Sequence, residues 1–233
     1  MLAPFQSHSN ATDPRFRLST SLLRKKGQHM KKIDAFNHIW PKPFFDALIG
    51  HIGTMTDITM RSGAVPMMTD LDRRFEVMDM FGPDYCQILS LASPPYEKYA
   101  DPEWSLKLAT IASDSMADLC RQYPERFPGF IGTAVMSNPK NLVKDAQRNI
   151  EELGALGMQI FTNVSGKPLD LSEFDPFFEY MARVNKPVWM HPSRGASFPD
   201  YLTEEKSEYE IWWTFGWPYE TSAAMARLVF SGH

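Results

Sequence analysis

The chain has 233 residues, of which 43% are hydrophobic and 22% charged, and its formal net charge is −4. This length and composition suit one large domain or two small ones of an ordinary globular protein. The negative charge argues against a nucleic-acid partner, and no apolar run reaches the ~20 residues of a membrane helix. Because Cys86 and Cys120 are too few for a disulfide framework or a zinc cluster, we expect a reducing, cytoplasmic setting.

Residues 1–29 differ from the rest of the chain. They carry five basic side chains against one acidic residue, Asp13, together with scattered Ser, Thr and Asn. Such a composition is found in organelle transit peptides and also in disordered extensions of folded domains. We expect an extension over residues 1–29, disordered or used for targeting, and a folded domain over residues 30–233.

Short apolar runs alternate with longer stretches of helical periodicity from Met30 onward. The runs predict strands over Lys32–His38, Tyr85–Ser93, Phe130–Met136, Met158–Val164 and Pro187–His191. The stretches between them predict helices over Leu71–Met80, Trp104–Arg121, Leu142–Leu153 and Asp175–Val184. This alternation of strand and helix indicates parallel βα units joined by right-handed crossovers.

Two α/β architectures fit this order: a (β/α)8 TIM barrel and an open parallel sheet. A glycine-rich phosphate loop after the first strand would favour the open, doubly wound sheet, and the sequence has none. Polar residues follow several strands instead, where a barrel builds its active site: His38, Ser93, Ser137, Asn163 and His191. We therefore predict a barrel, with an open five-stranded sheet as the alternative.

The predicted barrel is incomplete. A barrel needs eight strands and typically ~250 residues, whereas this sequence supplies five clear βα units and the segment 201–233. That segment stops within an apolar helical pattern, AAMARLVFSGH. We expect five to six units, without the last strands.

His38 and His191 end the first and the fifth predicted strand. Imidazoles at the ends of barrel strands can converge on one divalent ion, and zinc and related metals accept such ligands. A single histidine is more often a structural residue with satisfied hydrogen bonds. Two of them at two strand ends make a metal site an equally good explanation, so we predict His38 and His191 as metal ligands.

Several segments together resemble one family: IDAFNHIWP, QIFTNVSGKPLD, PVWMHPSRG and GWPYETSAAMARLVFSG. They are similar to the amidohydrolase-related, metal-dependent barrel enzymes, and most to the branch of the aminocarboxymuconate-semialdehyde and resorcylate-type decarboxylases. The resemblance extends from about Lys31 to the last residue. It implies a TIM barrel, a divalent metal (Zn or Mn) and activity on a small carboxylic acid.

The resemblance also implies which residues hold the metal. The family's first strand typically supplies His-x-His or Glu-x-His; the matching positions here are Phe36, which has no lone pair to donate, and His38. The family's fifth-strand histidine matches His191. A later histidine and an aspartate used by the family in catalysis would fall after His233. The catalytic residues therefore stay unknown.

Three residues are predicted to bind substrate. Arg194 can pair with a carboxylate through its guanidinium fork, although a solvated loop arginine has the same sequence pattern. Asn163 lies at a strand end that would face the barrel mouth. Trp217 belongs to an aromatic block typical of a ligand pocket or of a subunit contact: Trp212, Trp213, Phe215, Trp217 and Tyr219.

Together these features predict a metal-dependent decarboxylase or hydrolase for a small aromatic or unsaturated carboxylic acid. Decarboxylation enters only through the resemblance. The expected partners are this small-molecule substrate and a second copy in a homodimer, but neither nucleic acid nor membrane. The alternative is a catalytically silent barrel fragment, or a degenerate family member, that acts only through association.

Overall fold

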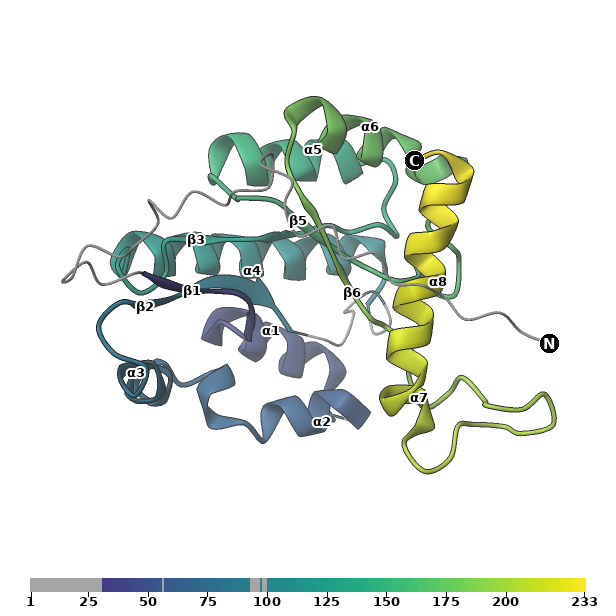
Figure 1. The fold of residues 1–233 in the computed structure, drawn as a ribbon, viewed down its shortest axis with the longest axis horizontal. Helices are drawn as coiled ribbons and strands as arrows, with labels where there is room; N and C mark the ends of the chain where they lie inside the picture. Colours follow the sequence, from purple (N-terminus) through teal and green to yellow (C-terminus); the bar gives the residue numbers. More distant parts are fainter. Residues whose placement is uncertain (1–30, 56, 93–96, 98–99) are drawn as a thin grey trace, which may run out of the picture. The chain divides into compact units, whose positions relative to one another are not determined.

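The computed structural model describes residues 31–55, 57–92, 97 and 100–233 (Figure 1). The extension predicted over residues 1–29 and the strand-end residue Ser93 lie outside this described part. None of the helices within it combines the length and the apolar character needed to span a bilayer.

All strands pair in parallel. In one sheet β1 (Lys32–Ile39) pairs with β2 (Tyr85–Leu91), which pairs with β3 (Gly129–Phe130). In the other, β4 (Gly132–Thr133) pairs with β5 (Met158–Phe161), which pairs with β6 (Val188–His191). The predicted βα units are therefore confirmed, and each predicted strand is found within one or two residues of its expected start.

The two sheets meet in one central strand. Ile131, the residue between β3 and β4, donates its N–H to Leu89 of β2 (2.8 Å), while Gly132 donates to Gly157 before β5 (3.0 Å). The strand predicted over Phe130–Met136 thus exists as two short halves, each bonded to a different neighbour. Within the described residues, the strand order β1–β2–β3/β4–β5–β6 supplies five of the eight strands that a complete barrel would need.

This five-stranded sheet is curled, so that its edge strands β1 and β6 touch through side chains. The ring centroids of Phe36 and Trp189 lie 5.3 Å apart, and those of His38 and His191 lie 4.9 Å apart. A flat open sheet would keep its first and last strands well separated, because neighbouring strands are ~4.8 Å apart. The curl favours the barrel-like prediction over the flat alternative.

The helices α1 and α2 were not anticipated. The helices before β4 are α1 (Lys42–Ile52), α2 (Asp57–Gly63), the short 3-10 turn η3 (Pro66–Met68), α3 (Leu71–Asp79) and α4 (Pro102–Gln122). Those after it are α5 (Leu142–Gln147), the π turn η5 (Arg148–Glu152), the 3-10 turn η6 (Ser172–Phe174), α6 (Asp175–Val184), α7 (Ile211–Thr214) and α8 (Gly216–Ser231). Helix α6 has the bounds that the sequence predicted.

Local chemistry explains several helix ends. Asp101 caps α4 by accepting from the N–H groups of Glu103 and Trp104, each at 2.9 Å, and Pro102 opens the first turn. The single helix predicted over Leu142–Leu153 divides into α5 and a π turn. There the buried Asn149 side chain donates to the Asp145 carbonyl (2.9 Å), the acceptor that its backbone N–H would use in an α-helix.

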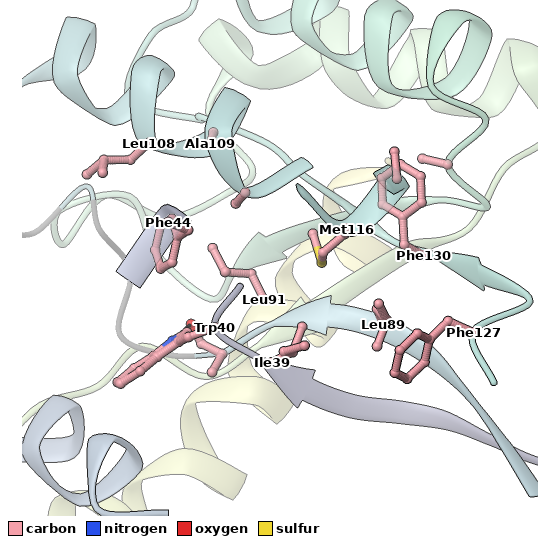
Figure 2. Close-up of a cluster of buried hydrophobic side chains, with 14 of the residues drawn as sticks. Ile39, Trp40, Phe44, Leu89, Leu91, Leu108, Ala109, Met116, Phe127 and Phe130 are labelled. Atoms are coloured by element: carbon pink, nitrogen blue, oxygen red, sulfur yellow. Dashed lines mark hydrogen bonds between the residues drawn. The ribbon is translucent and has the colours of Figure 1, made fainter. Parts of the chain in front are cut away.

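Two apolar clusters hold the helices on the sheet. The first joins β1 and β2 to α1 and α4, and Figure 2 shows Trp40 and Phe44 beside Ile39 and Leu91 in it. The second joins β5 and β6 to α5, α6 and α8. Leu89 and Leu91 face the first cluster, which leaves the alternate residue Ser90 on the opposite face of β2. That opposite face carries the polar groups described next.

Candidate metal centre and active site

The ring of His38 is held by a hydrogen bond that defines its tautomer. His38 Nδ1 lies 2.8 Å from Ser90 Oγ, on the neighbouring strand. The Ser90 hydroxyl donates its only hydrogen to the Asn37 carbonyl oxygen at 2.6 Å, so it must accept from His38 Nδ1–H. Nε2 of His38 therefore carries a lone pair and no proton.

His191 is held in the same tautomer by a different acceptor. Its Nδ1 lies 2.8 Å from the carbonyl oxygen of Pro192, which can only accept. Nε2 of His191 is therefore also an unprotonated lone-pair donor. Metal-binding histidines commonly have this arrangement, with one ring nitrogen donating to a carbonyl or hydroxyl group and the other left for the ion.

Both imidazoles are neutral. Burial, together with the neighbouring His191 and Arg74, lowers the pKa of His38 to about 3. Burial likewise lowers the pKa of His191, against a smaller opposing effect of its bond to Pro192. Neutral imidazole is the form that binds a metal, so both rings are ready to act as ligands.

Aromatic rings surround the histidine pair. Phe36 lies 5.0 Å from His38 and 6.4 Å from His191, between centroids. Phe161 and Trp217 lie 5.6 Å and 5.8 Å from His191. These rings give the site an apolar wall, which suits a flat aromatic ligand.

The histidines fit a divalent ion as two ligands but do not complete its coordination. Within the described residues, no group of three or more His, Cys, Asp or Glu side chains could hold a metal ion. Phe36 lies beside both rings and offers only its π face. Because catalytic zinc sites keep three protein ligands, His38 and His191 would not complete a metal centre by themselves.

A β-bulge separates Asp34 from the histidine pair. Asp34 pairs with Gln87 and Asn37 with Leu89, so β1 has one residue more than β2 in this interval. A regular strand would place Asp34, Phe36 and His38 on one face, as the sequence alternation predicts. With the bulge, Asp34 lies instead beside Tyr85, whose hydroxyl donates to it at 2.9 Å.

Asn163 belongs to a polar cluster that ties α8 to the ends of β5 and β6. Its Nδ2 donates to Ser193 Oγ at 2.7 Å and to Glu220 Oε1. Thr162 Oγ1 also donates to Glu220 Oε1 (2.7 Å) and accepts from the Ser193 N–H (3.0 Å). Ser193 is two residues beyond His191, so this cluster fixes the loop that follows the second histidine.

A polar cavity of about 330 Å³ opens beside that cluster. Its lining comprises Glu97, Asn163, Ser165, Gly166, Ser193, Gly195, Ser197 and Phe198. Burial raises the pKa of Glu97 to about 7, although its oxygen accepts from the Ser137 N–H at 2.7 Å. This carboxyl group can exchange a proton near neutral pH, a property that suits acid–base chemistry.

The other two predicted substrate residues differ in their surroundings. Trp217 packs against His191 and donates its Nε1–H to the Arg194 carbonyl at 2.9 Å. The Arg194 guanidinium lies over the Phe198 ring, 5.3 Å from its centroid, and donates to the Pro199 carbonyl (3.1 Å). The structure therefore brings Trp217 to the histidine pair and holds Arg194 in contacts within its own loop.

Comparison with known proteins assigns the family. A family model described as amidohydrolase matches residues 33–232. The chain belongs to the amidohydrolase family.

It is 29% identical to 2-amino-3-carboxymuconate-6-semialdehyde decarboxylase of Dictyostelium discoideum, over 86% of this chain and 58% of that protein. It is 28% identical to gamma-resorcylate decarboxylase of Polaromonas sp., over 80% of this chain and 61% of that protein. The chain thus spans about three fifths of the length of these relatives.

Solved structures of amidohydrolase-type decarboxylases share the fold. The 5-carboxyvanillate decarboxylase of Novosphingobium aromaticivorans, with bound manganese and 3-methoxy-4-hydroxy-5-nitrobenzoic acid, has a TM-score of 0.68 at 25% identity, over 87% of this chain and 62% of that one. The enzyme of Sphingomonas paucimobilis has a TM-score of 0.70 at 23% identity, over 88% and 64% of the two chains. A divalent metal is thus found in members of this amidohydrolase family, and decarboxylation is the activity of these relatives.

Several residues of the site escaped the sequence analysis of this amidohydrolase-family chain. Trp189 was predictable from the sequence, because it precedes His191 by two positions and so shares its strand face. Ser90 faces His38 only through the register of β1 on β2, which no short-range pattern reveals. Glu220 reaches the cluster from α8, more than fifty residues along the chain from Thr162. Its position in GWPYETS carries no signal for a contact with β5.

Proposed function

We propose that this chain forms the metal-binding and ring-binding part of a decarboxylase for a small aromatic or unsaturated carboxylic acid. The observation that carries the proposal is the pair of neutral imidazoles, His38 and His191, with both Nε2 lone pairs unprotonated and ring centroids 4.9 Å apart. A divalent ion of the kind bound by manganese-containing relatives would be held by these two nitrogens together with ligands outside the described set.

The residues present have separate roles in this proposal. His38 and His191 supply neutral nitrogen ligands, and Ser90 and the Pro192 carbonyl keep each ring in the required tautomer. Phe36 and Trp217 pack against the faces and edges of a planar substrate beside those ligands. When bound, a divalent ion supplies a Lewis acid that attracts the substrate's carboxylate and a neighbouring oxygen.

Decarboxylation replaces a C–CO2⁻ bond with a C–H bond. The bond to the carboxyl carbon breaks, its electron pair stays on the substrate carbon, CO2 leaves, and a proton from an acid takes its place. An apolar wall favours this step, because the charge localised on the carboxylate is dispersed towards the substrate carbon as the C–C bond breaks. The proton donor is not assigned to a residue of this chain.

The test is turnover of candidate acids by the full protein with Mn²⁺ or Zn²⁺. Suitable acids are 2,6-dihydroxybenzoate, 5-carboxyvanillate and aminocarboxymuconate semialdehyde, with CO2 release measured directly. In D2O the product should carry one deuterium at the carbon that lost CO2. His38→Ala and His191→Ala should each abolish metal-dependent turnover, while Lys42→Ala, a change at an exposed residue, should leave it unchanged.

The outcomes separate the candidate functions. Release of a hydrolysis product without CO2 would assign the hydrolytic branch, in which a metal-bound water is the nucleophile. Absence of any product with all acids and both metals, from a folded protein, would refute the decarboxylase proposal. That result would favour a catalytically silent member of the family.

A further inference from the structure

Arg74 of α3 is a buried cation whose hydrogen bonds all go to uncharged groups. Its residue surface is 3% exposed. Nε donates to the Met67 carbonyl (3.1 Å), one terminal nitrogen donates to Asn37 Oδ1 (3.1 Å) and Gln87 Oε1 (2.8 Å), and the other donates to the His38 carbonyl. The guanidinium fork is thus used at each of its three nitrogens.

No carboxylate of the described residues forms an ion pair with Arg74. Asp34 is reached only through intermediates: Arg74 bonds Gln87, whose amide donates to the Tyr85 hydroxyl (3.2 Å), which donates to Asp34. Burial without a paired carboxylate is unfavourable for a guanidinium charge, and it lowers the pKa of Arg74 to about 10. The guanidinium is therefore held in place by directed hydrogen bonds to Met67, Asn37, Gln87 and His38 and not by an ion pair.

Three of the four acceptors of Arg74 flank the bulge between β1 and β2. Asn37 and His38 follow the bulge, and Gln87 is the β2 residue that pairs with Asp34 before it. A bulge leaves an extra residue outside the regular ladder, so its conformation needs support from side chains. The Asn37 side chain accepts a hydrogen bond from Arg74 through Oδ1 and donates one from Nδ2 to the Ile88 carbonyl at 2.7 Å. Arg74 therefore bonds both sides of the irregularity and the carbonyl of His38.

We infer that Arg74 is a positioning residue for His38: it clamps the bulged end of β1 so that the His38 ring meets Ser90 and His191. The inference rests on the proposed function, because it concerns one of the two ligand histidines, and it extends that function to a residue on the opposite face of the sheet. The clamp acts through the backbone. It holds the carbonyl of His38 and the side chain of Asn37, whose own carbonyl accepts from Ser90.

The geometry requires a planar fork with several donors. A lysine keeps the charge but has one nitrogen, which cannot reach acceptors on β1, on β2 and in η3 at once. A methionine keeps most of the volume and removes every donor, which leaves Asn37 Oδ1, Gln87 Oε1 and two carbonyl oxygens without this partner. The lysine variant therefore tests whether the positive charge alone is sufficient. The methionine variant tests whether side-chain volume alone is sufficient.

Arg74→Lys and Arg74→Met test the inference, with Arg73→Met as the matched control. Arg73 is the neighbouring residue on α3, but its side chain is exposed and pairs with the nearby Glu76, while its backbone N–H donates to the capping Asp70. The first readout is the long-range ¹H–¹⁵N NMR spectrum of the histidine rings, assigned with His38→Ala. The second is the Mn²⁺ affinity of the full protein measured by calorimetry.

In the wild type and in Arg73→Met, the His38 ring should show one tautomer, with Nδ1 protonated and Nε2 bare. Both Arg74 variants should lose this single signature and bind Mn²⁺ about 10- to 100-fold more weakly, the usual effect of removing support behind a ligand. The signature of His191, held by Pro192, should persist. Guanidinium ion added to Arg74→Ala should restore the His38 signature in part.

Each contrary result is decisive. Folded Arg74 variants that keep the His38 signature and wild-type Mn²⁺ affinity would overturn the inference. So would a general loss of folding in both variants together with no rescue of Arg74→Ala by guanidinium, because Arg74 would then serve the whole domain. A wild type that binds no Mn²⁺ would refute the proposed function alone, since the His38 signature still reports on Arg74.

Discussion

Phe36 lies edge-on against His38, with ring centroids 5.0 Å apart and an interplanar angle of 74°. It also lies 6.4 Å from the ring of His191, so a side chain at position 36 reaches both histidines. Phe36 is itself 52% exposed, and its replacement should cost little stability. The position therefore lends itself to the addition of a third metal ligand.

We expect Phe36→Glu and Phe36→His to bind Mn²⁺ or Zn²⁺ more tightly than the wild type, by roughly tenfold or more, because the site gains a third protein ligand. Calorimetric titration of the same preparations measures the change. Phe36→Leu is the control, since it removes the ring and adds no donor atom. Equal affinity in all four proteins would show that position 36 does not reach the ion.

Glu220 should hold the ends of β5 and β6 together through the one carboxylate oxygen that accepts hydrogen bonds. Its Oε1 accepts from Thr162, Asn163 and Ser193, while Oε2 is buried without a hydrogen-bond partner. Glu220→Ala should lower the free energy of unfolding by about 1–3 kcal/mol, because it leaves part-buried donors unpaired. Urea unfolding measures this loss. Glu205→Ala, at an exposed residue, should have almost none, and similar losses in the two variants would contradict the assignment.

Substitution of Gly157 and of Gly50 by alanine should change the stability of the protein in opposite directions. A Cβ at Gly157 would lie 2.5 Å from the Pro187 carbonyl oxygen, which is part of the β5–β6 pairing. Gly157→Ala should therefore destabilise the protein by about 1–3 kcal/mol. A Cβ at Gly50, within α1, meets nothing within 4 Å, and Gly50→Ala should stabilise it by about 0.5–1 kcal/mol. Thermal melts compare the two; stabilisation by both would mean that β5 and β6 are farther apart at this point.

Asp145 should make stability fall as pH rises. Burial raises its pKa from 3.8 to about 7, against the lowering effect of Arg148, and its Oδ2 is buried without a hydrogen-bond partner. At pH well below 3.8 the carboxyl is protonated in both the folded and the unfolded chain, and it contributes nothing. Between pH 4 and 7 the unfolded chain loses this proton first, so folding is progressively disfavoured, and above pH 7 the loss is constant.

Asp145→Asn removes this titration and should make the protein more stable than the wild type at pH 8. The gain should be on the order of a few kcal/mol, at about 1.36 kcal/mol per pKa unit. It should shrink to nearly nothing at pH 4. Chemical denaturation at both pH values measures the difference, with Asp118→Asn as an exposed control. A gain that is the same at pH 4 and pH 8 would exclude a titrating Asp145.

The strand and helix pattern was predictable because each element carries its own period. Continuous apolar runs such as YCQILSL indicate strands covered on both faces, and the capping Asp101 followed by Pro102 indicates where α4 begins. Interruptions were harder to predict. The division of α5 from its π turn depends on one buried amide, Asn149, and the shortness of β3 and β4 depends on which neighbour each half meets.

Half of the candidate site was predictable for a similar reason. His38 and His191 stand at strand ends, and the ends of parallel strands gather at one edge of a sheet. Their tautomers required the register of β1 on β2 and the turn at Pro192. The bulge after Asp34 required the structure too, because a shift of one residue reverses the face of every side chain beyond it without changing the local alternation.

Parallel βα units, the resemblance to metal-dependent enzymes and the missing donor atom at Phe36 can all be read from residue identity and short-range spacing. The approach of β1 to β6, which lets His38 and His191 meet, follows from long-range packing. So do the contacts of Arg74 and Glu220 with the neighbouring strands and loops. These contacts join residues 36 to 153 positions apart, and the curl of the sheet is what brings His38 and His191 together.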